Sequence, residues 1–159
     1  MKKFFQHFEE YIAAAVFIVM LALTFANVVM RNFAAAISFT EEITSSLFVL
    51  LCMMGTAIAA RDQAHLGLSV VTEFIHPRKR AMVTAVGNLL GVVFSLILIK
   101  TGVEMVILEY EMEQISIALQ WPQWIYGSFL PFGAVCMAVR FAQAMLENLK
   151  TYKSMGEEK

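Results

Sequence analysis

Four long apolar runs follow one another along the chain, and polar or charged residues separate them. They cover about residues 11–30, 40–60, 81–101 and 121–142. A transmembrane helix needs about 20 largely apolar residues, so each run predicts one membrane span. The pattern therefore predicts an all-α integral membrane protein with four transmembrane helices in a single domain, residues 1–159.

The connection between the second and third runs is longer than a simple turn requires. Within residues 66–76, the apolar side chains of Val70, Val71, Phe74 and Ile75 share one face of a helix. Polar residues occupy the other face. This amphipathic pattern predicts a short interfacial helix on the cytoplasmic side, and a buried re-entrant segment is the alternative.

Lysine and arginine are concentrated beside alternate connections. The connection between the first two runs holds only Arg31, and the one between the third and fourth runs holds none. Because cytoplasmic flanks are enriched in basic residues, both termini are predicted to be cytoplasmic. The flanks assigned to that side contain Lys2, Lys3, Arg61, Arg78, Lys79, Arg80, Arg140, Lys150, Lys153 and Lys159.

The first run could also belong to a cleavable signal peptide. However, Glu9 and Glu10 precede it, and the run is longer than a signal-peptide core of about 7–15 residues. We therefore interpret the first run as a retained membrane segment.

The composition agrees with a membrane protein and narrows the chemistry. Hydrophobic residues make up 59% of the chain and charged residues 16%, against about 45–50% and 25% in soluble domains. The net charge of −1 gives no basic field for nucleic acid. Neither cysteine lies in a CxxC motif, and the chain has no phosphate-binding loop or HExxH motif. We therefore expect no catalytic, cofactor-binding or metal-binding residues and no enzyme activity.

Two adjacent glutamates, Glu41 and Glu42, open the second run. The sequence from Ser38 to Glu41 has the S-x-x-E pattern of a capping box, and acidic residues in a first turn favour the helix dipole. Arg31 on the same side of the membrane is a candidate partner. A cap or a structural ion pair is favoured over a proton relay.

The second span has two chemically different faces on an ideal helix. Its small and polar face is predicted to contact protein, and its bulky face is predicted to contact lipid. The first face contains Glu41, Ser45, Cys52, Thr56 and Ala59, and the second contains Ile43, Leu47, Leu50, Leu51, Met54 and Ile58.

The third span contains Gly87 and Gly91 in a GxxxG pattern, which allows close helix packing. Lys100 and Glu104 lie one turn apart near its outer end. They are predicted to form an intrahelical pair, and an ion path is the alternative. In the fourth span, Pro131 is predicted to kink the helix near its middle.

The order of several short motifs resembles one family. These are VVMRNF at the end of the first run, ISFTEE before the second, GTAIAARDQAHLGL after it and PRKR before the third. Over about residues 8–148 the chain resembles the small membrane subunit of tripartite ATP-independent periplasmic (TRAP) transporters, the DctQ-like family. It departs from the family at Phe39-Thr40, where a tryptophan often precedes the glutamates.

The resemblance implies a small, non-catalytic scaffold subunit of a sodium-coupled importer in the bacterial inner membrane. The implied partners are membrane lipids, a large multi-span permease that binds the sodium ions, and a periplasmic binding protein. That protein would deliver an organic acid of the carboxylate or sialic acid class. On this analogy the matching positions are architectural: Arg31, Glu41, Glu42, Arg61 and His65.

Other readings of the chain give different functions. An acidic patch of Glu109, Glu111 and Glu113 is a candidate docking surface for the binding protein, or only a solvated loop. A structural assembly factor without a transport role fits the same four spans. A small four-helix exporter would need an acidic residue in its first span, and residues 11–30 contain none. A membrane enzyme would need paired cysteines or histidines within spans, which the sequence lacks.

Overall fold

The computed structural model describes residues 7–33, 38–62 and 77–157. Within these ranges the chain is helical apart from turns and one isolated backbone bridge. The helices are α2 (Phe8–Phe33), α3 (Ser38–Arg61), α5 (Pro77–Glu111), α6 (Trp124–Gly127) and α7 (Phe129–Glu157). Four of the described helices are long and apolar enough to cross a membrane, which confirms the four-span, all-α prediction. The interfacial helix predicted at 66–76 lies outside the described residues.

Local sequence explains where the first two helices begin and end. The α2 segment contains neither glycine nor proline, so nothing interrupts its hydrogen-bond ladder. Glu9 and Glu10 lie in its first turn and Arg31 in its last. The α3 helix repeats this polarity, with Glu41 in the first turn and Arg61 in the last. Each charge faces the end of the helix dipole that it stabilises.

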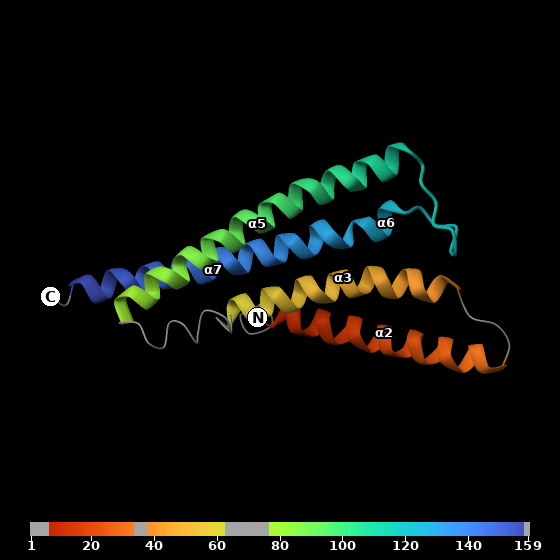
Figure 1. Ribbon diagram of the computed structural model, residues 1–159, viewed down its shortest axis with the longest axis horizontal. Coiled ribbons are helices and arrows are strands. Elements are labelled where there is room, and N and C mark those ends of the chain that lie inside the picture. The colour runs from red at the N-terminus through yellow and green to blue at the C-terminus, as the bar shows by residue number, and fades with distance from the viewer. Residues whose placement is uncertain (1–6, 34–37, 63–76, 158–159) are drawn as a thin grey trace.

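The four long helices run alternately up and down (Figure 1). We call the end where α2 begins and α3 ends the first end of the bundle, and the opposite end the second end. The α7 helix packs against both α5 and α3, whereas α2 packs mainly against α3. The α5 and α7 helices extend past the other two at the first end. The start of α2 and the end of α7 thus lie toward the same end.

The third and fourth spans differ from their predicted boundaries. Helix α5 continues to Glu111, ten residues past the predicted limit. The fourth span is divided at Ser128 between α6 and α7, so Pro131 lies in the first turn of α7. The predicted kink near the middle of the helix was wrong. Pro131 has no N–H for the carbonyl of Gly127, and this places the break near the second end.

Small side chains form much of the core and allow α7 to approach its neighbours closely. Gly133 of α7 faces α3 so closely that an added Cβ would lie 2.6 Å from the Cβ of Met53. Gly102 of α5 faces Pro131 in a similar way, with 3.1 Å to the proline Cδ. The buried apolar residues are Leu50, Met54, Ala57, Ala60, Ala85, Ala134, Met137, Phe141 and Ala144.

The predicted faces of the second span were wrong. Leu50 and Met54, which were assigned to lipid, are buried in the core, and Cys52, assigned to protein, is exposed. The reason is that Gly133 of α7 leaves room for bulky side chains of α3, since an added Cβ there would meet Met53 and Leu50. Close packing requires a small residue on one helix only.

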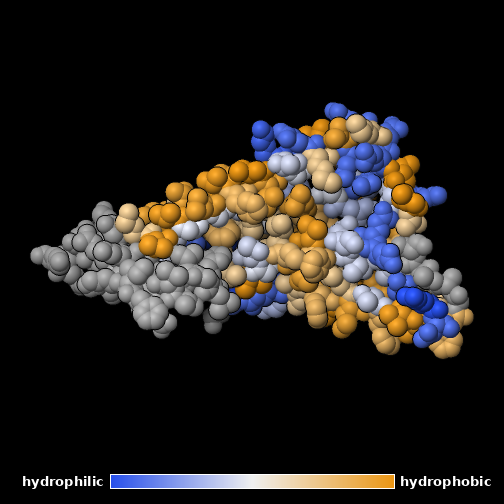
Figure 2. All heavy atoms as spheres, viewed as in Figure 1, coloured by the Kyte–Doolittle hydropathy of each residue, from blue (hydrophilic) through white to orange (hydrophobic). Residues whose placement is uncertain are grey.

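The outer surface of the bundle suits a lipid environment. Figure 2 shows hydrophobic residues over much of the middle of this face and hydrophilic residues gathered toward the second end. On α2, the large apolar side chains of Phe17, Ile18, Leu21 and Phe25 are all exposed. This distribution matches a bundle whose sides contact hydrocarbon and whose second end contacts water.

One glycine of the GxxxG pattern lies in a tight contact. An added Cβ on Gly91 would lie 2.5 Å from the ring of Phe141, and that ring is itself buried. Gly55 of α3 provides a contrast, because an added Cβ there meets nothing within 4 Å. The predicted role of Gly91 in close helix packing is therefore confirmed, and its neighbour is α7.

We expect Gly91→Ala to destabilise the protein by about 1–3 kcal/mol, because the methyl group overpacks the α5–α7 contact. Gly55→Ala is the matched control, and its better helix propensity should leave stability unchanged or raise it by up to about 1 kcal/mol. Thermal unfolding of both variants in one detergent measures the difference. Equal midpoints would contradict the packing role of Gly91.

Candidate functional site

A buried ion pair joins the first turn of α2 to the middle of α7. The guanidinium of Arg140 donates from Nε to Glu9 Oε1 and from Nη2 to Glu9 Oε2, each at 2.7 Å. The side chains of Arg140 and Glu9 are only 10% and 9% exposed. Gln143, one turn further along α7, accepts a third hydrogen bond from Nη1 of Arg140 at 2.9 Å. This bidentate geometry fixes both the position and the orientation of the start of α2.

A second set of charges at the same end joins α2 to α3. Arg61, the last residue of α3, donates from Nη2 to Glu10 and from Nε to Asp62, which is 2.9 Å away. His7 pairs with Glu10 at 2.9 Å. Because the Arg61 guanidinium donates hydrogen bonds to Asp62, the pKa of the Asp62 carboxyl is lowered from its ordinary value.

We call Glu9, Glu10, Arg61 and Arg140 the charge clamp. Its acidic members lie on consecutive residues of α2, and its basic members come from α3 and α7. A polar hollow of about 410 Å³ lies beside it. Each clamp arginine faces a glutamate of α2, so the arrangement holds three helices together.

The opening glutamates of α3 have different surroundings at the second end. Glu42 accepts a hydrogen bond from the hydroxyl of Ser116, in the segment after α5. Glu41 and Arg31 are both exposed. In the described part of the chain, no ion pair joins Arg31 to Glu41 or Glu42. The prediction that Arg31 is their partner within this chain was therefore wrong. The side chain of Ser38, the predicted cap residue, is not among the side chains that the structure describes.

The acidic patch predicted after the third span is smaller than expected. Glu109 is only 4% exposed, and its Oε2 is buried without a hydrogen-bond partner. It faces Gly127 of α6, because a Cβ built on that glycine would collide with Oε2 of Glu109. Because α5 continues through Glu109, this side chain turns into the bundle and cannot form part of a docking patch. Glu111 and Glu113 are exposed.

The other predicted site residues are an ion pair and a glycine on α5 and a histidine in the second connection. Lys100 and Glu104 form the expected intrahelical pair, with 3.8 Å between Nζ and Oε1. Both side chains are exposed, so the pair contributes little to stability. Gly87 is half-buried on α5, and His65 lies outside the described residues.

Sequence reasoning missed the most buried polar contacts. Glu9 was used only to argue against a signal peptide, and Arg140 only to orient the chain. Ser116 was not considered. A signal existed for the ion pair, because both residues border apolar runs on the same predicted side of the membrane. Opposite charges at one membrane boundary are candidates for pairing.

Comparison with protein families places this fold and its motifs in one group. A family model described as "Tripartite ATP-independent periplasmic transporters, DctQ component" matches residues 20–151. The chain belongs to the DctQ family. As a TRAP small-permease chain it is a multi-pass membrane component of a transporter, as its sequence motifs predicted.

The names of individual relatives of this DctQ-family chain agree with the family match. A "Putative TRAP transporter small permease protein" of Haemophilus influenzae is 26% identical over 94% of this chain and 88% of its own length. The "C4-dicarboxylate TRAP transporter small permease protein DctQ" of Rhodobacter capsulatus is 28% identical, over 65% of this chain and 45% of that one.

A third relative has a different length. The "Sialic acid TRAP transporter permease protein SiaT" of Haemophilus influenzae is 27% identical over 96% of this chain, but this match covers only 24% of that protein. The DctQ-family chain therefore corresponds to one quarter of a larger permease polypeptide.

Breaking the buried half of the charge clamp should destabilise the protein strongly. We expect Glu9→Gln or Arg140→Gln to cost about 3–5 kcal/mol, because each leaves one charge buried without its partner. The apolar double variant Glu9→Leu/Arg140→Met should recover much of the loss. Unfolding in a fixed detergent measures these changes.

The exposed pair on α5 is the matched control for this prediction. Glu104→Gln should change stability by no more than about 1 kcal/mol. If Glu9→Gln had no larger effect than Glu104→Gln, the clamp would not stabilise the fold.

Proposed function

We propose that this chain is the small, non-catalytic scaffold subunit of a sodium-coupled TRAP transporter. In this proposal it binds a large multi-span permease in the bacterial inner membrane, with both termini cytoplasmic. The permease binds the sodium ions and imports an organic acid of the carboxylate or sialic acid class. A periplasmic binding protein delivers that acid.

The family match over residues 20–151 carries this proposal. The SiaT relative supports a large partner, since nearly all of this chain matches one quarter of that permease. The substrate class rests on the printed names of relatives, which mention sialic acid and C4-dicarboxylate.

The chemistry of the polar groups favours a scaffold over a transport path. Charges within the bundle are used to join helices, as in the Glu9–Arg140 pair. Hydroxyls within spans bond to their own helix: Ser95 to the carbonyl of Gly91, Thr56 to that of Cys52 and Thr101 to that of Ile97. Such groups stabilise helices and contacts.

Part of the predicted docking surface for the binding protein remains in this proposal. Glu111 and Glu113 are exposed at the second end, where both would face the periplasm. Their charge would act mainly on the rate of association with a basic surface.

Reconstitution separates the scaffold from its alternatives. We expect proteoliposomes with this chain alone to bind and move no substrate, and those with the large permease and binding protein to transport in a sodium gradient. Asn88→Ala, at a buried position of α5, should change the amount of complex or the maximal rate. It should leave the apparent sodium affinity within about twofold, a difference near 0.4 kcal/mol.

Transport by the purified small subunit alone would support a self-sufficient exporter. Full transport by the permease and binding protein without this chain would support an assembly factor. Either result would overturn the scaffold proposal.

Cysteine labelling tests the proposed orientation. In a Cys52→Ser/Cys136→Ser background, we expect Met112→Cys to react with an impermeant maleimide added from the periplasmic side. Lys150→Cys should react only after permeabilisation, because basic flanks stay in the cytoplasm. Both positions are exposed, so burial does not confound the comparison. The opposite labelling pattern would show that the orientation is inverted.

A further inference from the structure

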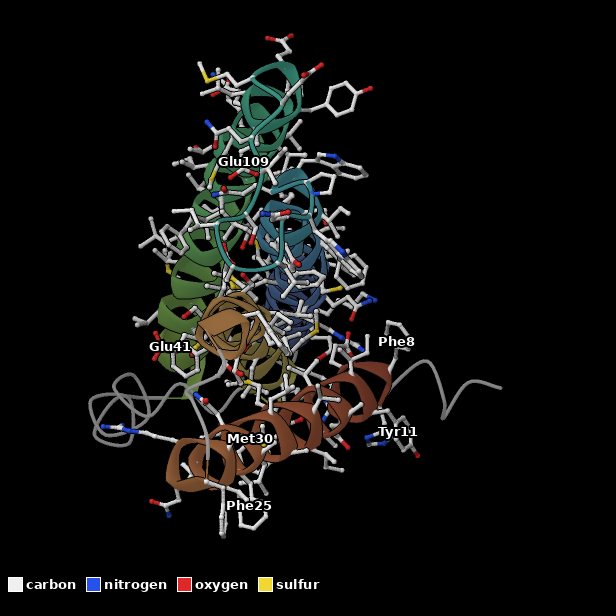
Figure 3. All side chains as sticks on the ribbon, turned by 90° about the vertical axis from the view of Figure 1, so that its right-hand side faces the viewer. Phe8, Tyr11, Phe25, Met30, Glu41 and Glu109 are labelled. Carbon is white, nitrogen blue, oxygen red and sulfur yellow. The ribbon has the colours of Figure 1, made fainter. Side chains whose placement is uncertain are left out.

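Helices α2 and α3 are held together at the first end and diverge toward the second (Figure 1, Figure 3). The charge clamp explains the close end, since it ties the start of α2 to α3 and α7. Between the diverging halves lies an open groove of about 530 Å³. That volume is far more than the roughly 30 Å³ occupied by a water molecule, so the groove can hold side chains.

The lining of this α2–α3 groove combines apolar surface, including Met20 and Phe48, with several polar side chains. Its polar lining is Thr24 and Asn27 from α2 and Thr40, Glu41, Thr44 and Ser45 from α3. Thr24 lies nine residues before the end of α2, which corresponds to about 14 Å along the helix. The groove therefore reaches from the second end into the region of the hydrocarbon.

Hydrocarbon alone is a poor occupant for such a groove. Thr24, Glu41 and Ser45 are exposed polar side chains in its lining. An acyl chain offers neither a donor nor an acceptor, so it leaves polar groups unsatisfied. A transmembrane helix with small or hydroxyl side chains can approach closely and supply both.

We propose that the α2–α3 groove is the docking site for a transmembrane helix of the large permease subunit. This inference rests on the proposed function, and it adds the surface and the chemistry of the contact. The SiaT relative supports a polypeptide occupant, because the part that this chain matches is covalently joined there to a longer permease polypeptide. The docking helix carries small or hydrogen-bonding residues along the face that enters the groove.

Charges at the mouth of the groove define the end of that helix. Arg31 lies seven residues after Thr24, so both are on the same face of α2. The carboxylate of Glu41 lines the mouth from α3, and no ion pair joins it to Arg31 within the described chain. A docking helix with a basic residue near Glu41 and an acidic residue near Arg31 would satisfy both.

Site-specific photocrosslinking in the native complex tests this surface. Benzoylphenylalanine replaces Thr24 in one variant and Ala26 in a matched control on the same helix. Both positions are exposed, and they point about 160° apart around α2. We expect irradiation to join the Thr24 variant, but not the Ala26 variant, to the co-purified large permease, identified by mass spectrometry.

The outcomes separate this inference from the proposed function. If the permease co-purifies but Thr24 gives only a lipid adduct, an adduct with a second copy of this chain or no adduct, the groove is not the docking site. The scaffold function then stands. If no large permease co-purifies with the unmodified chain, both fail.

A steric variant provides an independent measurement. Thr24→Trp should reduce the co-purified permease roughly tenfold, equivalent to about 1.4 kcal/mol, because the indole occupies the groove. Ala26→Trp should leave the yield unchanged. Equal unfolding midpoints of the two isolated variants establish that the loss is not a folding defect. Equal yields of permease from the two folded variants would overturn the inference.

Discussion

The buried pair of Glu9 and Arg140 is the constraint on which the position of α2 depends. Helix α2 packs mainly on α3 and exposes most of its apolar surface. In lipid, apolar surface gains little from association, so packing alone holds such a helix weakly. A bidentate arginine–glutamate pair in a poorly hydrated position is strong and directional. It fixes one end of α2 against α7 and leaves the other end free to diverge.

The distribution of polar groups follows from that geometry. At the first end, charges on three helices neutralise one another within the charge clamp. Along the spans, serine and threonine hydroxyls bond to carbonyls of their own helices. The α2–α3 groove differs from both regions, because it combines exposed polar side chains with apolar surface and has charges at its mouth. A bundle built in this way has one end held by ion pairs and an open groove at the other.

Helix α7 has the complementary role in the fold. It contacts α3 at Gly133, which receives bulky side chains of α3, and it contacts α5 at Phe141, whose ring packs on Gly91. It also carries Arg140, so the helix that forms the packed core is the one that anchors α2. Packing and electrostatics thus converge on one element, and this gives a small membrane subunit a defined shape without a large core.

The sequence by itself determined the properties that depend on length, polarity and order. Four apolar runs of membrane length required four spans, Lys100 and Glu104 one turn apart required their pair, and the ordered motifs identified the family. Tertiary structure alone decided which faces meet. It buried Leu50 beside Gly133 of α7, and it turned Glu109 into the bundle because α5 continues past it. It also paired Glu9 with Arg140 across 131 positions, a contact that no local pattern encodes.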